Sequence, residues 1–587
     1  MFLVLFLAAN ILSTVFSIDR HTSIFGYYSR FNGGLLSIAA FIILYFGVIA
    51  NLNRLQAKKV IFFSLISAFL VAVWGIPSHF GLDFSCWLIV GKFTPCWQQD
   101  FNPTLRIFST LGQPNWLAAF LVITAPGAWA FLIASQKIKL KLFFWLISSV
   151  MFLALIFTNS RAGIAAFAIS VTVFLILLII GFAKKTIDLN WKTQGLWIGS
   201  LVVAFALIFF VFGQFLLGRV TQVAESLPQQ PTSPSGQTAI AVGGTESGKI
   251  RLIVWKGAIE IFKHYPITGS GVETFAYSYY QFRPTEHNQT TEWNFLYNKA
   301  HNEFLNYLAT TGAAGIVSYL LFIGVFLFLA TFAVVKKTNN SKNKLLAIGL
   351  ISGFVGNLAA NFFGFSVVAT NLLFFLIPAA TCLILGIGSR KEVKISFPSI
   401  FVWLATTLVI LGQIGASLVI LRFFLADIRF AASSQTFSDS ALIPVVSAVE
   451  ISPVSQPEFL SQQALIAAQV AVNQTQDHRE SLLKLADESI KKALQISPAN
   501  LNSYQTAVTI YSQYLSQIDP KYNQTAIELA GKAALLAPTD PTTQYNLAVV
   551  LANNGQKAEA VKILEKTIEL KPDYQPALEM LETLNQN

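Results

Sequence analysis

The sequence predicts an all-α protein, in which a polytopic bundle of about eleven membrane-spanning helices is followed by a soluble helical-repeat domain. Of its 587 residues, 54% are hydrophobic and only 12% are charged, and the mean hydropathy is +0.58. Soluble globular chains carry about 25% charged residues. The charges are absent in blocks of about 17 to 25 apolar residues, the length that crosses a bilayer. After Arg422 the chain becomes polar and keeps a helical period.

Each predicted span is an apolar window without Asp, Glu, Lys or Arg. The windows cover residues 2–17, 33–50, 60–77, 114–134, 142–158, 162–182, 195–217, 313–335, 345–363, 371–388 and 397–421. Because residues 345–388 are uncharged throughout and too long for one helix, we interpret them as two helices that turn at residues 364–370. Met1 lies inside the first window with no basic segment before it, so we expect no cleaved signal peptide and a natural start that is missing.

Basic residues predict the side of the membrane that each connection faces. They gather in every second connection, at residues 51–59, 135–141, 183–192, 336–344 and 389–394. Positively charged connections are retained on the cytoplasmic side, so this alternation explains the net charge of +11 and we expect no nucleic-acid partner. The remaining connections should face outward. We therefore predict a membrane domain at residues 1–425, with a large extracytoplasmic loop at 218–312, and an extracytoplasmic repeat domain at 426–587.

Two cysteines lie in the predicted outer loop at residues 78–113. Cys86 and Cys96 are ten positions apart, and cysteines in an oxidising compartment are candidates for a disulfide. Two reduced, unrelated cysteines are the alternative. Cys382 lies within a predicted span, and we interpret it as a packing residue.

The C-terminal region contains a helical repeat. Its clearest unit covers residues 545–572, with a turn at Gly555 and a stop at Pro572, and weaker copies end at Pro538 and Pro498. Two facing apolar stripes belong to the clearest unit: Leu547, Ala548 and Leu551, then Ala560, Leu564 and Thr567. This spacing resembles the tetratricopeptide repeat. Such repeats hold a peptide or a protein partner on a concave face; an inert scaffold is the alternative.

The predicted spans contain no Asp, Glu, Lys, Arg or His. Ion-coupled transporters usually carry carboxylates or histidines inside the bilayer, so the pattern disfavours a transporter or a flippase. A reactive site is expected at the membrane surface, and the outer surface has the better candidates.

Arg161 is the first candidate. It follows a short connection in which Asn159 or Ser160 caps the next helix, and free N–H groups beside a guanidinium favour an anion. An arginine that snorkels to lipid head groups is the alternative.

Arg251 and His301 are the other candidates. Arg251 lies on an amphipathic helix that stops at Pro266. The Gly-rich residues 266–271 lack a preceding strand, so we interpret them as a turn rather than a phosphate loop. His301, with Glu303 beside it, precedes the span at 313–335. A lone outer-loop histidine is usually structural, but this one lies where a lipid-linked substrate would present its sugar.

Four segments, taken in order, are similar to the O-antigen ligase superfamily of lipopolysaccharide O-antigen ligases, O-antigen polymerases and protein O-oligosaccharyltransferases. They are LGQPNWLA at 111–118, NSRA at 159–162, Arg251 with Trp255 and PITGSG at 266–271, and HNEFL at 301–305. Each motif is short. Their order and common predicted side make the set specific.

The resemblance implies a metal-independent glycosyltransferase of the GT-C-like helical type, without a cofactor, in a bacterial cytoplasmic membrane. Its donor is a glycan on undecaprenyl pyrophosphate, and its acceptor is a hydroxyl on a glycan, a lipid or a protein. By motif, Arg161 and Arg251 match arginines that hold the pyrophosphate, and His301 matches the essential outer-loop histidine. Arg219 is a fainter candidate for the same anion. Glu303 would orient His301 or compete for its role.

General chemistry agrees with these roles. Negative charge develops on a departing pyrophosphate and must be neutralised. The sequence has no Asp-x-Asp motif for a metal, which favours arginine as the clamp. Histidine has a suitable pKa for a base near neutral pH. The appended repeat domain departs from the lipopolysaccharide ligase pattern and indicates a partner or acceptor outside the membrane. A non-catalytic membrane scaffold is the remaining alternative.

Overall fold

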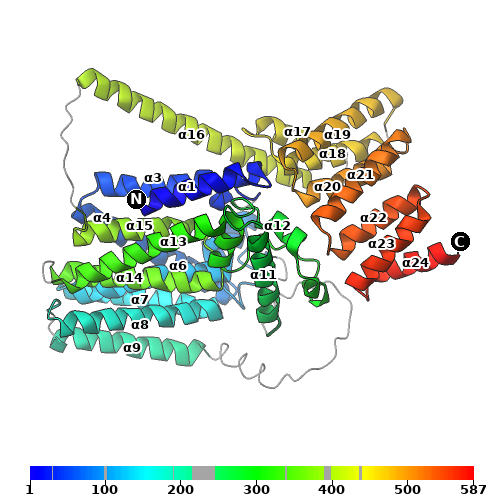
Figure 1. Cartoon of the computed structure of the whole chain (residues 1–587). Helices are drawn as coiled ribbons and strands as arrows, with labels where there is room; N and C mark the ends of the chain where they lie inside the picture. Colours follow the sequence, from blue (N-terminus) through cyan, green and yellow to red (C-terminus); the bar gives the residue numbers. More distant parts are fainter. Residues whose placement is uncertain are drawn as a thin grey trace. The chain divides into compact units, whose positions relative to one another are not determined.

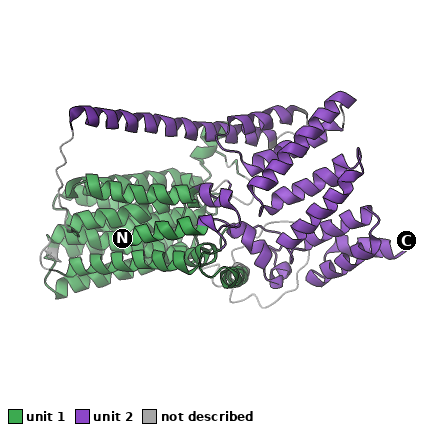
Figure 2. Cartoon of the chain, turned by 45° about the horizontal axis from the view of Figure 1, so that its top comes forward, with its two compact units in different colours: residues 1–13, 32–269, 299–389 green, residues 14–31, 270–298, 390–587 purple. Residues whose placement is uncertain are grey.

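The computed structural model describes residues 1–28, 31–94, 96–97, 102–188, 191–213, 245–336, 340–388, 398–434, 439–472 and 474–586 (Figure 1). Within these ranges the chain is helical and has no β-strand, which confirms the predicted all-α class. Its contacts define two compact units (Figure 2). Unit 1 comprises residues 1–13, 32–269 and 299–389, and unit 2 comprises residues 14–31, 270–298 and 390–587. Residues 214–244 lie outside the described ranges; they comprise the last four residues of the predicted span at 195–217 and the first part of the predicted long loop, including Arg219.

Long apolar helices make up most of unit 1, and Figure 1 shows them side by side with nearly parallel axes. They are α1 (Phe2–Val15), α3 (Leu35–Asn51), α4 (Arg54–His79), α6 (Pro114–Ala134), α7 (Ile138–Phe157), α8 (Arg161–Ala183), α9 (Trp191–Phe212), α13 (Glu303–Val335), α14 (Ser341–Phe362) and α15 (Val368–Leu385). One more apolar helix, α16 (Ser399–Ser434), belongs to unit 2. In the described ranges nine helices are long and apolar enough to cross a membrane, and α1 and α3 are shorter apolar helices. These helices occupy the eleven predicted windows.

Helix α6 is the most buried of the candidate spans, with 89% of its apolar window inside the protein. Helix α14 approaches α6 closely because α14 has glycines at the positions that face its neighbouring helices. A Cβ atom on Gly353 would lie 2.2 Å from the carbonyl oxygen of Ile123, and one on Gly349 would lie 2.4 Å from that of Pro126. Gly356 meets the side chain of Ser170 on α8. Small residues at such spacing let membrane helices pack backbone to backbone.

Helix α13 begins ten residues before the predicted span because a kink joins two helical pieces. Gly312 is non-helical, with φ of 61°. The amide of Ala313 donates to the carbonyl of Pro266 at 2.9 Å, and Gly269 packs against the backbone of Thr310. The Gly-rich segment is therefore a turn that docks on this kink and fixes the end of helix α11 (Thr245–His264).

The C-terminal helices of unit 2 form the predicted repeat. They are α17 (Leu442–Ile451), α18 (Pro457–Ala471), α19 (Gln476–Ile496), α20 (Leu501–Thr509), the π-helical turn η5 (Ile510–Leu515), α21 (Lys521–Leu536), α22 (Pro541–Asn553), α23 (Lys557–Leu570) and α24 (Gln575–Gln586). Helices α19, α21 and α23 end two residues before Pro498, Pro538 and Pro572, since the residue before a proline disfavours the α conformation. Gly555 has the positive φ that the turn requires, at 77°.

Two segments from elsewhere in the chain are built into unit 2. Residues 270–298 contain α12 (Phe275–Phe282), and residues 14–31 contain α2 (Arg20–Phe25). The buried guanidinium of Arg283 lies 3.2 Å from the carboxylate of Asp540, and Asn288 donates to the carbonyls of Thr539 and Leu570.

The N-terminal segment packs on the same unit. Asp19 accepts a hydrogen bond from the hydroxyl of Ser497, and the hydroxyl of Tyr28 donates to Asp427 at 2.8 Å. The predicted domain boundary at residue 425 lies inside α16, which runs without interruption from Ser399 to Ser434.

Candidate active site

Arg161 is the first residue of α8, and its side chain is exposed. Ser160 caps this helix, because its hydroxyl accepts from the amide of Gly163 at 3.1 Å. Asn159 adopts a left-handed conformation with φ of 49°, which asparagine tolerates better than most residues. The cap therefore falls on Ser160, one of the two predicted positions. It leaves the positive end of the helix dipole next to the guanidinium.

Asn115 links this helix start to the LGQPNWLA motif at the start of α6. Its side-chain oxygen accepts from the hydroxyl of Ser160 at 2.8 Å and from the guanidinium of Arg106 at 3.1 Å. Arg106 also donates to the carbonyl of Thr158 at 3.1 Å. Three hydrogen bonds thus fix the Thr158–Arg161 turn against α6. Sequence reasoning missed Arg106, because its partners lie 9 and 52 positions away.

The turn between α14 and α15 connects the first and fourth motifs. The ring of Phe365 lies 6.1 Å from that of Trp116 and 5.4 Å from that of His301, measured between centroids. Phe365 is buried. It was not a sequence candidate, since phenylalanine is abundant in this chain, with 51 copies.

Arg251 is half-buried on α11. One turn later, the indole N–H of Trp255 donates to the carbonyl of Ala300 at 3.1 Å, and its ring lies 5.7 Å from that of Phe362 at the end of α14. Helix α11 is thereby held next to the residue that precedes His301. The motif that contains Arg251 and Trp255 is thus in contact with the segment that leads into the HNEFL motif.

His301 has a left-handed backbone conformation, with φ of 51°. Its neighbours fix this geometry: Asn302 caps α13 by accepting from the amide of Leu305 at 3.1 Å, and Asn306 accepts from the amide of Ala300 at 3.3 Å. A bulky residue with positive φ is uncommon and carries strain that its surroundings must hold. The imidazole is half-buried and lies against Phe365.

Glu303 is buried, with 6% of its surface exposed. Its carboxylate accepts from the amide of Ser366 at 3.2 Å, and the hydroxyl of Ser366 accepts from Asn361 at 2.8 Å. The carboxylate therefore binds the turn that carries Phe365. This geometry favours the first of its two predicted roles, which is to orient His301 through its support.

Cys86 and Cys96 are joined in a disulfide, and Cys382 is a free cysteine within α15. Cys86 lies on a short helix, α5 (Phe84–Val90), which Asp83 caps. Asp83 also accepts from the indole of Trp97 at 2.8 Å. In the described part of the chain, no group of three His, Cys, Asp or Glu side chains is arranged to hold a metal ion.

Fold and site together define a polytopic membrane protein in which the four motifs meet at one end of the unit 1 bundle. They lie at the starts of α6, α8 and α13 and on α11, and the end of α14 connects them. Residues 146–320 match the O-antigen ligase family, and residues 541–574 match a tetratricopeptide repeat. The first match contains Arg161, Arg251, His301 and Glu303. Both matches confirm the predicted resemblance. A search of curated proteins found no match.

Proposed function

We propose that this protein transfers an oligosaccharide or polysaccharide from undecaprenyl pyrophosphate to an acceptor hydroxyl, at the outer face of a bacterial cytoplasmic membrane. The O-antigen ligase match supports a role in glycan ligation or polymerisation at a membrane. The observation that carries the proposal is the convergence of the four motifs, which brings a histidine and two arginine-bearing helices to one end of the bundle.

The reaction needs a base and a site for the leaving group. The acceptor oxygen attacks the anomeric carbon of the donor sugar, and its proton passes to the imidazole of His301. The bond between that carbon and the pyrophosphate oxygen breaks, and the lipid pyrophosphate leaves with the electron pair. An imidazole is suited to accept this proton because its ordinary pKa of about 6.5 lies near the operating pH.

Arg161 and Arg251 neutralise the charge that develops on the pyrophosphate. Guanidinium groups bind phosphate oxygens through paired hydrogen bonds and stay charged at every physiological pH. Removing one oxyanion-hole donor typically costs about 2.7 to 4 kcal/mol of transition-state stabilisation, and we expect a comparable cost for the loss of one of these arginines. In this mechanism the arginines act without a metal ion, and Arg219 is a third candidate for the same anion.

Three acceptors are compatible with this chemistry: a lipid-linked sugar, the growing end of another glycan, and a protein hydroxyl. They correspond to a ligase, a polymerase and a protein O-oligosaccharyltransferase. The distribution of basic connections supports an outer location for both the repeat domain and the proposed site. A repeat domain on that side would bind a partner or present an acceptor.

Replacement of His301 tests the proposal in cells. We expect His301→Ala to abolish transferred glycan and to make the lipid-linked donor accumulate. His478→Ala is the matched control, because His478 is exposed on α19, and it should leave transfer intact. Mass spectrometry of the product in wild-type cells identifies the acceptor. Unchanged transfer in the His301→Ala cells would refute the proposal, and so would loss of transfer without donor accumulation.

A further inference from the structure

An apolar patch covers the segment that follows helix α4. Ile89 and Leu88, on the short helix α5, are 70% and 63% exposed. The patch as a whole consists of Phe80, Leu82, Trp87, Leu88, Ile89, Val90 and Phe93, and all of these residues belong to unit 1. A contiguous apolar surface of this kind marks a contact with a membrane or with another protein.

The segment has a fixed structure that displays these side chains. Its helix α5 is attached to α4 through Trp74, whose indole N–H donates to the hydroxyl of Ser85 at 3.1 Å and whose ring lies 5.5 Å from that of Phe84. The amide of Asp83 donates to the carbonyl of Phe93 at 2.8 Å. The disulfide described above closes the same segment covalently.

The one acidic side chain of the segment is satisfied internally. Asp83 is the only Asp or Glu in residues 79–97, and it is buried. Its carboxylate accepts from the amides of Ser85 and Cys86 and from the indole of Trp97. Lipid offers no hydrogen bonds to replace those of water. The start of α5 can therefore enter an apolar environment without leaving this carboxylate or these amides unpaired.

The patch continues an apolar surface that already faces lipid. Helix α4 is a candidate membrane span, and its exposed side chains include Phe63, Leu70 and Val73. Phe80 and Leu82 follow directly after its last residue. This continuity favours the bilayer as the partner of the patch.

The residues at the far end of the segment are typical of a membrane interface. The ring of Trp87 stacks on that of Phe93, with 5.6 Å between centroids, and Lys92 beside them is exposed. Tryptophan gathers at the level of the head groups, and lysine extends its ammonium group to them while its methylene groups stay in lipid.

The segment is also joined to the turn that carries Arg161. The ring of His79 stacks on that of Phe157 at 4.0 Å between centroids, and the ring of Phe80 lies 5.8 Å from it. Phe157 is the last residue of α7, and its carbonyl accepts from the amide of Ile107 at 3.0 Å. An anchor at this place would set the depth of the Arg161 turn relative to the lipid phosphates.

We propose that residues 80–93 lie in the lipid leaflet around the end of the bundle that carries the four motifs, with the exposed side chains of α5 below the head groups and Lys92 among them. The segment is thus a membrane anchor within the loop predicted at residues 78–113. This contact with lipid does not depend on the proposed glycan transfer.

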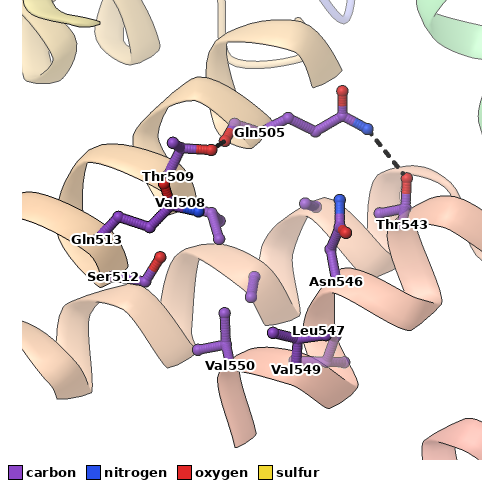
Figure 3. A pocket seen from close by; sticks show the side chains of 12 residues that line it. Gln505, Val508, Thr509, Ser512, Gln513, Thr543, Asn546, Leu547, Val549 and Val550 are labelled. Carbon is purple, nitrogen blue, oxygen red and sulfur yellow. Dashed lines mark hydrogen bonds between the residues drawn. The ribbon is translucent and has the colours of Figure 1, made fainter. Parts of the chain in front are cut away.

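Spin labels measure the depth of the segment in the full chain, reconstituted into vesicles of phosphatidylethanolamine and phosphatidylglycerol. Cys382, a free cysteine, is first replaced by alanine. A nitroxide on Ile89→Cys then reports collisions with oxygen, which concentrates in lipid, and with a nickel chelate, which stays in water. Leu70→Cys on α4 is the lipid reference. Gln513→Cys is the water reference, because Gln513 is exposed beside a largely polar cavity of the repeat domain (Figure 3).

We expect the ratio of oxygen to nickel collisions at Ile89 to exceed that at Gln513 several-fold and to approach that at Leu70, at a depth of roughly 5 to 10 Å below the phosphates. In the same labelled protein, Leu88→Asp should lower the ratio toward the value at Gln513, because a carboxylate opposes insertion. Lys92→Arg is the matched control, since it keeps the charge, and should leave the ratio unchanged.

Three results would overturn the proposal. Frequent nickel collisions at Ile89 would put the segment in water, and few collisions with either reagent would mean that protein covers the patch. An unchanged ratio in a folded Leu88→Asp protein would count equally against it. The measurement at Ile89 keeps the native neighbours, so it decides the question even if Leu88→Asp fails to fold. No substrate is present, so a failure of the proposed glycan transfer would leave these results unaffected.

Discussion

Asn115 shows how one side chain can join two motifs that lie far apart in the sequence. Its oxygen accepts from Ser160 and from Arg106, so two connecting segments share one acceptor. The amide nitrogen of Asn115 takes no part in either bond. An aspartate at this position would keep both bonds, whereas an alanine would lose both.

We predict that Asn115→Ala lowers glycan transfer by roughly tenfold to a hundredfold, because small displacements of a substrate-binding group are costly. Asn115→Asp should retain most of the activity. Transfer rates of the two variants, at equal amounts of membrane-inserted protein, provide the test. Equal loss in both variants would mean that the amide nitrogen of Asn115 matters, and the proposed bridge would be wrong.

Glu303 is predicted to position the site rather than to exchange a proton. Its carboxylate oxygen accepts from the amide of Ser366, and a glutamine oxygen can do the same. We expect Glu303→Gln to retain transfer within about threefold, and Glu303→Ala to lose it by about tenfold or more. Transfer rates of both variants across pH 5 to 8 decide the question. If Glu303→Gln is as inactive as Glu303→Ala, Glu303 takes part in the proton transfer.

At the scale of elements, the 3-10 turn Thr285–Gln289 carries a buried histidine, His287, which packs against Tyr279 of α12. The Nδ1 atom of His287 lies 2.8 Å from the hydroxyl of Tyr279, and Nε2 lies 3.2 Å from the carbonyl oxygen of Glu292. Because a carbonyl only accepts, Nε2 carries the ring proton and Nδ1 accepts. Burial, together with the positive charge of Arg283, lowers the pKa of His287 to about 4.

This histidine predicts a pH dependence for the packing of residues 270–298. In the unfolded chain its pKa is about 6.5, so between pH 6.5 and 4 the unfolded state binds more protons than the folded state. The contribution of His287 to stability is therefore present above pH 6.5 and decreases as the pH falls toward 4. We predict that the stability advantage of wild type over His287→Gln shrinks by up to about 3 kcal/mol between pH 7 and pH 4.

Hydrogen exchange of the amides in residues 275–290 measures this difference, after correction for the intrinsic pH dependence of exchange. The comparison with the variant is necessary because burial raises the pKa of Glu458 to about 7. The contribution of Glu458 is present below pH 4.5 and decreases as the pH rises through 7, in the opposite direction. A stability difference that does not change with pH would contradict the prediction.

Helix ends and packing faces were predictable to the extent that local chemistry decides them. Prolines at 498, 538 and 572 stop three helices, and uncharged windows correspond to the apolar helices. The kink at Gly312 was not predictable, because it depends on the docking of Pro266 and Gly269.

The candidate site was predictable only where a residue's type and local motif identify it. Arg161, Arg251 and His301 stand out by residue type and motif. Arg106 and Phe365 do not, since their importance arises from partners distant in the sequence.

At the scale of the whole molecule, the units cut across the predicted domains. Residues 18–31 and 270–298 were expected as loops of the membrane domain, yet they belong to the same compact unit as the repeat helices. Buried contacts such as Arg283 with Asp540 make this association specific. Charge counting predicts sides of the membrane, whereas it carries no information on which soluble segments pack together. The compact unit that contains the repeat helices therefore also includes two segments from earlier in the chain.

The central claim is that the histidine and arginine motifs transfer a lipid-linked glycan. Its most direct test uses the purified full chain in lipid vesicles with an undecaprenyl-pyrophosphate-linked oligosaccharide, the acceptor identified in cells, and a metal chelator. We predict transfer and release of undecaprenyl pyrophosphate by the wild type, and a loss of about a hundredfold or more in Arg251→Ala and His301→Ala. Equal release by the wild type and both variants, or a strict requirement for a divalent cation, would contradict the account.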